Sequence, residues 1–442
     1  MRTTLCVIIF LSVTYEPFWT SSSVQSWPFH SSISLAHRIK SFRAPAREPH
    51  PSHAGCRHYL HHPTMLATPM DIDVPAAPPS GNAARPPRDT TTELSSIMSS
   101  FRPTKLFTRD TKDKKSTYIL SLDFDDPGEL CMTSESDDTV QIYSVREGKH
   151  DKSLISKKYG AKLARFTHWS SSIVYASTKQ NDAIRYLATH DNSFIRYFEG
   201  HEAPVTSISM HPGTDNFISS SLDGTVRLWN VASKQWTGLL YVNKPYLSAW
   251  DPSGNIFAVG SPASGSVLLY DHRNYTKPPF SVFDVVEQCS TVDQRNLLQG
   301  WTKLDFSNDG KHILVGTRGA GHFLLDAFDG SLKAFLRKTE EPTRRAAVGE
   351  GSGLSTPPVD PGHLESSGNC CFSPDGRYVL GGGKQNVLVW DTLATAGPDK
   401  VLNPSFALED KRESAVVAFN PRFNLFATAD QSLVFWLPDA NA

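Results

Sequence analysis

Short runs of β-branched and aromatic residues, separated by Asp, Gly, Asn and Pro, fill the larger, C-terminal part of the chain. Alternation of apolar and polar positions within such runs is typical of strands that bury one face. The clearest unit is EGHEAPVTSISMHPGTDNFISSSLDGTVRLWN, residues 199–230. Its pattern predicts strands at Val205–Met210 and Phe217–Ser221, a tight turn at Asp223-Gly224, and a third strand that ends at Trp229-Asn230.

This unit is repeated along the chain. In each of seven repeats the third strand ends at a residue equivalent to Trp229, which we call the closing residue. The closing residues are Tyr143, Tyr186, Trp229, Tyr270, Leu325, Trp390 and Trp436. The steps between these residues are 43, 43, 41, 55, 65 and 46 residues. A period of 40–45 residues with four short strands and a Trp-Asp ending resembles the WD-repeat β-propeller. The repeats therefore predict an all-β, seven-bladed WD-repeat propeller over residues 101–438.

Two of the steps exceed the period because of insertions, at residues 287–300 and at about 337–368. Both should form loops outside the blades, and the second, rich in Gly, Pro, Ser and charge, is predicted to be disordered. The last repeat ends at Trp436-Leu437, so the last blade lacks its outermost strand. The run Thr104–Thr108 precedes the first repeat, and we expect it to pair with the last blade and close the ring.

Residues 1–97 have a different composition, with 12 of the 30 prolines but only 2 of the 28 glycines. They lack strand or helix periodicity after about residue 15, which predicts a disordered extension. The apolar run Leu5–Val13 after Arg2 resembles a signal peptide, but its cleavage site is poor. Three interpretations stay open: an over-extended gene model whose true start is Met98, a genuine disordered tail, and secretion.

Composition and short motifs argue against several classes of function. Lys plus Arg is 44 and Asp plus Glu is 45, a balance that argues against a polybasic nucleic-acid binder. Six cysteines without a CxxC pair rule out a disulfide scaffold, and no apolar run is long enough to span a membrane. The His-rich stretch 50–62 has metal-ligand composition but no zinc-module spacing. We expect no metal site, and no nucleotide-binding motif predicts a cofactor.

Four residues of the clearest unit match the hydrogen-bonded tetrad of WD repeats, a loop His, a strand Ser, a turn Asp and a strand Trp: His201, Ser219, Asp223 and Trp229. The same residue types could form a Ser-His-Asp triad. No G-x-S-x-G elbow accompanies them, so we interpret the tetrad as structural and predict no catalytic residues. Cys370 and Cys371 lie on a predicted strand, where adjacent side chains point to opposite faces, and are interpreted as packing residues.

Residues 146–165 carry seven Lys or Arg against two acids. One interpretation is a solvated edge strand that charge protects from pairing. The other is a docking surface for an acidic or phosphorylated peptide, with Lys157, Lys158, Lys162 and Arg165 as candidate contacts.

Several segments are more specific than a generic repeat. They are DDTVQIYS (137–144), SKKYG (156–160), NDAIRYLATHDNSFIRYFEGH (181–201), FISSSLDGTVRLW (217–229), WTKLDFSNDGKHILVGT (301–317), DAFDG (326–330) and FNPRFNLFATADQSLVFWLP (419–438). These segments closely resemble the Swd-two family, called WD-repeat protein 82 in animals. The resemblance covers about residues 101–438, and residues 1–97 have no counterpart in that family.

The resemblance implies a non-catalytic nuclear scaffold subunit of the Set-one/COMPASS complex, which methylates lysine 4 of histone H3. It also implies membership of the cleavage and polyadenylation factor and a role in transcription termination. A further implied partner is the phosphorylated tail of RNA polymerase II, for which the basic stretch is our candidate contact. Neither a membrane nor sequence-specific nucleic acid is expected as a partner. The alternatives are an adaptor of another nuclear complex, such as a ubiquitin ligase, and a secreted propeller.

Overall fold

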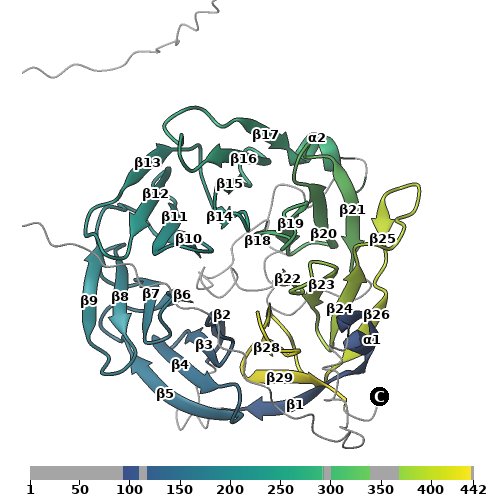
Figure 1. Ribbon diagram of the computed structural model, residues 1–442, viewed down its shortest axis with the longest axis horizontal. Helices are drawn as coiled ribbons and strands as arrows, with labels where there is room; N and C mark the ends of the chain where they lie inside the picture. The colour runs from purple at the N-terminus through teal and green to yellow at the C-terminus, as the bar shows by residue number, and fades with distance from the viewer. Residues whose placement is uncertain (1–92, 109–116, 291, 293–299, 339–367, 440–442) are drawn as a thin grey trace, which may run out of the picture. The chain divides into compact units, whose positions relative to one another are not determined.

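The structure, a computed structural model, describes residues 93–108, 117–290, 292, 300–338 and 368–439. Within these residues the strands form seven sheets, six of four strands and one of five. Figure 1 shows the sheets arranged as blades around a central axis. The predicted seven-bladed propeller is therefore confirmed.

The first four blades take their strands in chain order. The first contains β2 (Ile119–Phe124), β3 (Leu130–Glu135), β4 (Thr139–Ser144) and β5 (Lys149–Ile155). The second contains β6 (Lys162–Phe166), β7 (Ser172–Ala176), β8 (Ile184–Ala188) and β9 (Phe194–Phe198). The third contains β10 (Val205–Met210), β11 (Asn216–Ser221), β12 (Thr225–Asn230) and β13 (Gly238–Tyr241). The fourth contains β14 (Leu247–Trp250), β15 (Ile256–Ser261), β16 (Ser266–Asp271) and β17 (Ser281–Asp284).

The last three blades depart from this order. The fifth contains β18 (Trp301–Phe306), β19 (His312–Thr317), β20 (Gly321–Asp326) and β21 (Leu332–Arg337), with β25 (Val401–Leu402) added. The sixth contains β22 (Cys370–Phe372), β23 (Tyr378–Gly382), β24 (Asn386–Asp391) and β26 (Phe406–Glu409). The seventh contains β27 (Val416–Phe419), β28 (Phe426–Ala429) and β29 (Leu433–Pro438), together with β1 (Phe101–Phe107) from the other end of the chain.

The third blade shows how the repeat folds. Its β11 and β12 pair antiparallel with Phe217 opposite Trp229, and a tight turn at Gly224 joins them with a φ of 80°. A positive φ suits glycine, which has no Cβ to collide with the backbone. Both strands are buried along nearly their whole length, because neighbouring blades cover both faces of each sheet.

One closing residue was predicted one position too early. In the second blade Leu187, rather than Tyr186, pairs with Ile173 in the register that joins Trp229 to Phe217 in the third blade. Leu187 also packs against the preceding blade, as Trp229 does. The turn between β7 and β8 is longer than its counterpart in the third blade, which moves the register relative to the regular spacing.

Ring closure uses strands from both ends of the chain. The strand β1 pairs antiparallel with β29 from Phe101 opposite Pro438 to Phe107 opposite Leu433. The expected pairing of the Thr104–Thr108 run with the last blade is thus seen, although the strand begins earlier. Packing extends back to α1 (Leu94–Ile97) and the short 3-10 turn η1 (Met98–Ser100), since Met98 is fully buried.

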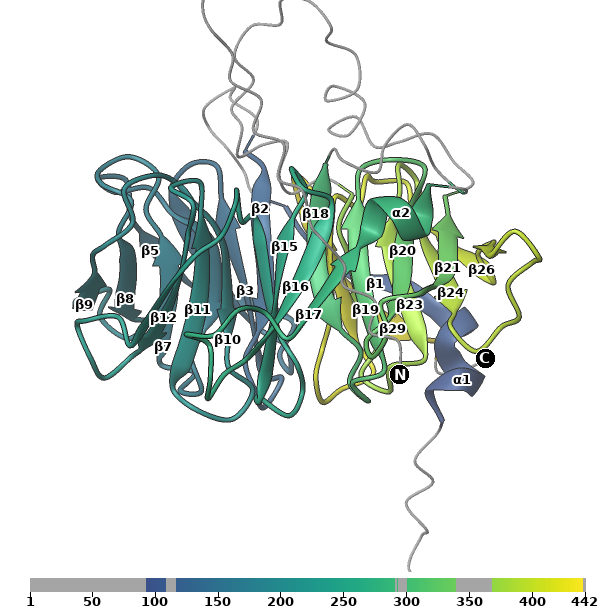
Figure 2. The same cartoon turned by 90° about the horizontal axis from the view of Figure 1, so that it is seen from above.

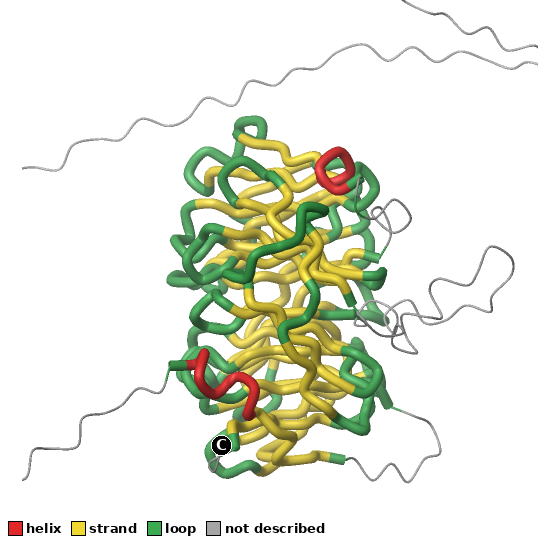
Figure 3. Tube along the Cα trace, turned by 90° about the vertical axis from the view of Figure 1, so that its right-hand side faces the viewer, coloured by secondary structure: helices red, strands yellow, loops and turns green. Residues whose placement is uncertain are grey.

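The insertions contribute two features that the sequence did not predict. The helix α2 (Val285–Cys289) overlaps the start of the first insertion, and the Asp284 carboxylate caps it by accepting a hydrogen bond from Glu287 N at 2.9 Å. In Figures 2 and 3, α1 lies towards one face of the ring and α2 towards the other. The strand β25, from the connection between β24 and β26, adds in parallel to β21 of the fifth blade.

Other expectations fall outside the described residues. Most of the predicted disordered extension (residues 1–97), the signal-like run Leu5–Val13 and the His-rich stretch 50–62 lie within residues 1–92. For the last residues of the extension the prediction was wrong, because Leu94–Ile97 form α1 and pack against the core. Of the second insertion, only the two ends are described.

Candidate functional site

The tetrad residues lie together between the second and third blades. The His201 ring bonds through Nδ1 to Asp223 Oδ2 at 2.9 Å and through Nε2 to Ser219 Oγ at 2.8 Å. The indole Nε1–H of Trp229 donates to the same Ser219 oxygen at 2.8 Å. One neutral tautomer satisfies the whole chain: His201 donates from Nδ1 to the carboxylate and accepts the Ser219 proton at Nε2.

Burial explains the electrostatics of this chain. Burial lowers the pKa of His201 despite the neighbouring carboxylate, so the ring stays neutral. Burial alone would raise the pKa of Asp223, but hydrogen bonds from Thr225 and His201 outweigh it and lower that pKa. The Ser219 and Trp229 side chains are fully buried. The His201 and Trp229 rings enclose the Ser219 hydroxyl, so a substrate carbonyl cannot reach it. This supports a structural role for the tetrad.

Reduced versions of the tetrad occur elsewhere. In the seventh blade the Trp436 indole donates to Thr428 Oγ1 at 2.9 Å. In the sixth blade Gly381 occupies the position of the tetrad serine, and the buried Trp390 indole nitrogen has no hydrogen-bond partner within the described part of the chain. A Cβ at Gly381 would lie 2.8 Å from the Trp390 ring, so a serine would not fit there without a shift.

A cavity of about 520 Å³ occupies the central channel, lined by the first strand of every blade. One charged pair in it joins neighbouring blades: Arg165 Nη1 lies 3.5 Å from Asp123 Oδ1, whose other oxygen accepts a hydrogen bond from Phe166 N at 2.8 Å. Burial raises the pKa of Asp123 more than the Arg165 charge lowers it. Ser207 and Ser248 share a 2.6 Å hydrogen bond across another seam. These contacts join blades and are accounted for by the fold.

The structure separates the four candidate partner-binding residues. Lys157 and Lys158 are exposed on the turn between β5 and β6. Lys162 is only 9% exposed, and both it and Arg165 line the channel. The four side chains therefore form two groups rather than one surface. The preceding strand β5 is the mostly exposed outer strand of its blade, in agreement with the edge-strand interpretation.

An aromatic ring, which sequence reasoning missed, lies beside the exposed lysines. Lys158 Nζ lies 5.0 Å from the centroid of the Tyr159 ring, and the Arg185 guanidinium lies 3.5 Å from the same centroid. Next to them, Lys179 forms an ion pair with Asp138 and donates to the Lys157 carbonyl at 3.3 Å. The surface around the turn thus mixes cations, one acid and an aromatic ring.

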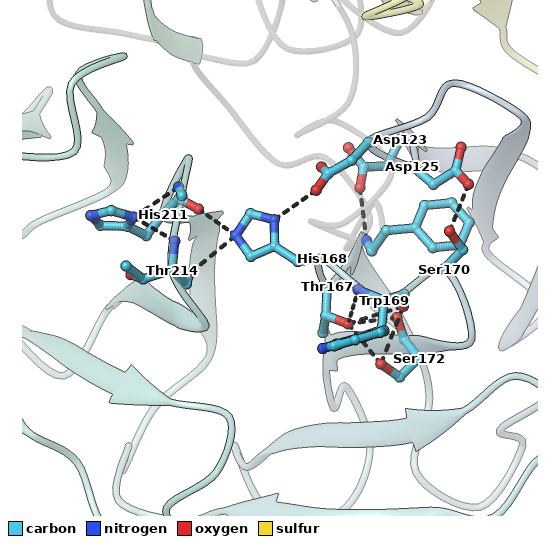
Figure 4. Close-up of polar contacts among 12 residues, drawn as sticks. Asp123, Asp125, Thr167, His168, Trp169, Ser170, Ser172, His211 and Thr214 are labelled. Atoms are coloured by element: carbon cyan, nitrogen blue, oxygen red, sulfur yellow. Dashed lines mark hydrogen bonds and ion pairs between the residues drawn. The ribbon is translucent and has the colours of Figure 1, made fainter. Parts of the chain in front are cut away.

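A second unpredicted network joins the turns between the first and second strands of four successive blades. Figure 4 shows the part of it around His168, His211 and Thr214. His168 Nδ1 lies 2.7 Å from Asp126 Oδ2, and His168 Nε2 lies 3.0 Å from the His211 carbonyl and 3.1 Å from that of Thr214. His211 in turn donates from Nε2 to the Gly254 carbonyl at 3.1 Å. Every partner of His168 is an acceptor, so the ring satisfies them all only as a cation.

The direction of the pKa shift of His168 agrees with a cationic ring. Burial alone would lower the pKa of His168, but the hydrogen bond and charge of Asp126 outweigh it, and the pKa is raised. The network could have been found from the sequence, because Asp126, His168, His211 and Gly254 follow one another at steps of 42, 43 and 43 residues.

The vicinal cysteines face opposite sides of their strand, as predicted. Cys370 packs towards the fifth blade and Cys371 towards the seventh. Burial raises the pKa of Cys371 to about 12 and that of Cys370 further, so both thiols stay protonated at neutral pH. In the described part of the chain, no cluster of His, Cys, Asp or Glu could hold a metal ion. The described helices are all too short or too polar to cross a membrane.

Fold and tetrad define the chain as a WD-repeat β-propeller, and the family model "WD domain, G-beta repeat" matches residues 192–230 and 358–391. The chain is 34% identical over 350 residues to "Set1 complex component swd2" of Schizosaccharomyces pombe, which covers 72% of this chain and 92% of the relative. It is 34% identical to "COMPASS component SWD2" of Saccharomyces cerevisiae, over 74% of this chain and 93% of the relative. It is 35% identical to "WD repeat-containing protein 82" of Drosophila melanogaster, over 78% and 96%. The chain belongs to this Swd2/WD repeat-containing protein 82 family.

Proposed function

We propose that the chain is a non-catalytic, nuclear WD-repeat subunit of a Set1/COMPASS-type complex that methylates lysine 4 of histone H3. The observation that carries the proposal is similarity over nearly the whole length of two fungal relatives whose names place them in that complex. The expected partners are therefore protein subunits.

The geometry supports a scaffold rather than an enzyme. The single Ser-His-Asp arrangement that the sequence suggested is enclosed by Trp229, and the charged groups Asp123 and Arg165 in the channel pair with each other. Each is accounted for by packing between blades. A scaffold also fits an exposed outer strand such as β5, which offers a docking position.

A finer part of the proposal concerns a second assembly. We infer from the family resemblance that the chain also joins the cleavage and polyadenylation factor and acts in transcription termination. Lys157 and Lys158 are our candidates for contact with an acidic or phosphorylated peptide such as the tail of RNA polymerase II. Their exposure and the neighbouring Tyr159 ring support this choice, whereas the burial of Lys162 argues against including it.

Two alternatives remain. The chain could act as an adaptor of another nuclear complex, such as a ubiquitin ligase, because fold alone does not define function. A secreted propeller would require that residues 5–13 act as a signal. Of the predicted extension at residues 1–97, residues 1–92 stay a proposal, whereas α1 packs against the propeller of residues 101–438. Residues 337–368 stay a proposed loop of that domain.

The proposal is tested by purifying the endogenous, C-terminally tagged chain from nuclear extract and identifying its partners by mass spectrometry. We expect subunits of the Set1 complex or of the polyadenylation factor. A Lys157→Glu/Lys158→Glu variant should lose a phosphorylated partner and keep the others, with Lys149→Glu/Lys152→Glu on the neighbouring edge strand as the charge-matched control. Purification of ubiquitin-ligase subunits alone would overturn the main proposal. Unchanged partners in the Lys157/Lys158 variant would overturn the assignment of the acidic contact.

A further inference from the structure

One position of the third strand of each blade, two residues before the closing residue, faces the seam with the preceding blade. Four blades have an apolar residue there: Leu268, Phe323, Leu388 and Val434. The three others have polar residues, at Gln141, Arg185 and Arg227. A polar group in a buried seam needs hydrogen-bond partners, so these three positions can be compared directly.

Two of the three polar side chains have partners within the chain. The Gln141 amide donates to Thr139 Oγ1 at 2.8 Å, and its carbonyl oxygen accepts from Ser153 Oγ at 2.5 Å. Arg185, only 3% exposed, donates from Nε to Ser177 Oγ at 2.7 Å and from Nη2 to Asn181 Oδ1 at 3.0 Å.

Arg227 differs from both. It is only 7% exposed, and neither its Nε nor its Nη1 has a hydrogen-bond partner among the residues that the structure describes. Its guanidinium lies 4.4 Å from the centroid of the Trp236 ring, in a slot closed on another side by Gly200, where a Cβ would lie 2.6 Å from Nη1. Among the described residues no carboxylate forms an ion pair with it, and this includes Glu199 and Glu202, which flank Gly200 in the sequence. A nearly buried, unpaired arginine is rare because its desolvation is not compensated.

Trp236 leaves one wall of the slot open to another protein, although the Arg227 side chain itself is nearly buried. Arg227 belongs to β12 and Gly200 to the connection between β9 and β10, so the slot lies at the seam between the second and third blades. Figure 1 shows β9 and β13 on the outer side of the ring at this seam. Trp236 is 39% exposed and belongs to the connection between β12 and β13. Aromatic residues and arginine are the residue types that dominate binding energy at protein interfaces.

We propose that Arg227 and Trp236 form a socket for a carboxylate side chain of a partner polypeptide, with an adjacent apolar residue of that partner on the exposed indole. The incoming carboxylate supplies the missing counter-charge to Arg227. A carboxylate fits better than a phosphate because the slot holds one unpaired cation, whereas a phosphate carries nearly two charges and is usually bound by several cations. This inference rests on the proposed function only in taking the partner to be another subunit of the complex.

The matched arginine offers a first test on the free, full-length chain. Arg227→Met keeps the apolar stem and removes an unpaired charge, so we expect a melting temperature within about 2 °C of the wild type, or higher. Arg185→Met removes a charged group whose hydrogen bonds are satisfied, and it should lower the melting temperature by about 4 °C or more. Equal destabilisation by both variants would show that Arg227 is a structural residue and would overturn the proposal.

The second test identifies the partner in the native complex. A Glu199→p-benzoyl-phenylalanine chain, expressed in place of the wild type, places a photo-crosslinker beside the slot. We expect a cross-linked peptide from another polypeptide with an Asp or Glu close to the linked residue. The same peptide, synthesised and titrated against the purified chain by calorimetry, should bind Arg227→Met at least 30-fold more weakly. An Asp→Asn or Glu→Gln peptide should lose about as much, and the two changes together should cost no more than one.

Several outcomes would contradict the socket. In the cross-linking experiment these are no cross-link to another polypeptide, a cross-link to residues 1–92 of the same chain, and a linked peptide that lacks an acid or carries a phosphate. In the titration, the contradicting result is unchanged binding of the peptide to Arg227→Met. An acidic peptide from an unrelated complex would overturn the proposed function and leave the socket standing. Recovery of Set1-complex subunits without a cross-link would overturn the socket and leave the proposed function standing.

Discussion

Removal of β1 should prevent the propeller from folding. A chain that begins at residue 109 lacks the outer strand of the seventh blade and leaves β29 as an open edge. It also lacks Phe101 and Met98, both fully buried in the core shared by the sixth and seventh blades. Phe101 lies 5.2 Å from Phe426, ring centroid to centroid.

The size of the effect follows from these two side chains. Deleting a buried Phe costs about 3–5 kcal/mol and deleting a buried Met about 2–5 kcal/mol. Their combined loss, about 5–10 kcal/mol, equals most of the roughly 5–15 kcal/mol by which domains are stable. A chain that begins at residue 98 keeps both side chains and loses only the partly buried Leu94 and Ile97. It should therefore fold, with a modestly lower melting temperature.

Differential scanning calorimetry of three chains, beginning at residues 93, 98 and 109, measures this directly. We expect cooperative transitions for the first two and none for the third. Phe101→Ala in the longest chain, with its strand intact, should cost about 3–5 kcal/mol and so separates the side chain from the strand. A cooperative transition of the chain from 109, within about 5 °C of the longest one, would refute the reasoning.

Three further predictions concern single groups. Trp229→Ala should cost about 3–5 kcal/mol in urea unfolding and release no hydrolase activity towards ester substrates; a hydrolase activity lost in Ser219→Ala would contradict the structural role of the tetrad. Because the pKa of His168 is raised, its contribution to stability should be full below about pH 6.5 and decline as the pH rises through its folded-state pKa, so the stability difference between wild type and His168→Gln should shrink from pH 6 to pH 9. A difference that stays constant or grows would show that the ring is neutral. Cys370 and Cys371 should resist iodoacetamide at pH 8 in the folded chain and react in urea; rapid labelling of the native protein would contradict their burial.

The repeat could be predicted because each blade carries the same local signals. About 30 residues encode the strand alternation, the Asp223-Gly224 turn and the closing Trp229. The period at which this unit repeats along the chain then gives the number of blades. The error at Tyr186 arose because a longer turn changes the register without changing the spacing much. Likewise β25 could not be predicted, since two residues that join a neighbouring blade carry no periodicity.

The candidate site depended on contacts between blades, which a single repeat does not encode. Residues 146–165 form one basic stretch in sequence, but strand direction carries Lys162 and Arg165 into the channel and leaves Lys157 and Lys158 outside. The unpaired state of Arg227 also depends on its neighbours, because the equivalent Arg185 finds partners on the turn of its own blade.

The most direct test of the account measures histone H3 lysine 4 methyltransferase activity in material purified from nuclear extract through a tag on this chain. We predict that the activity elutes with the chain, and that the chain purified alone has none, as expected of a scaffold subunit. Intact tagged chain recovered from the nucleus without that activity would contradict the proposed function, and activity in the isolated chain would contradict its non-catalytic role.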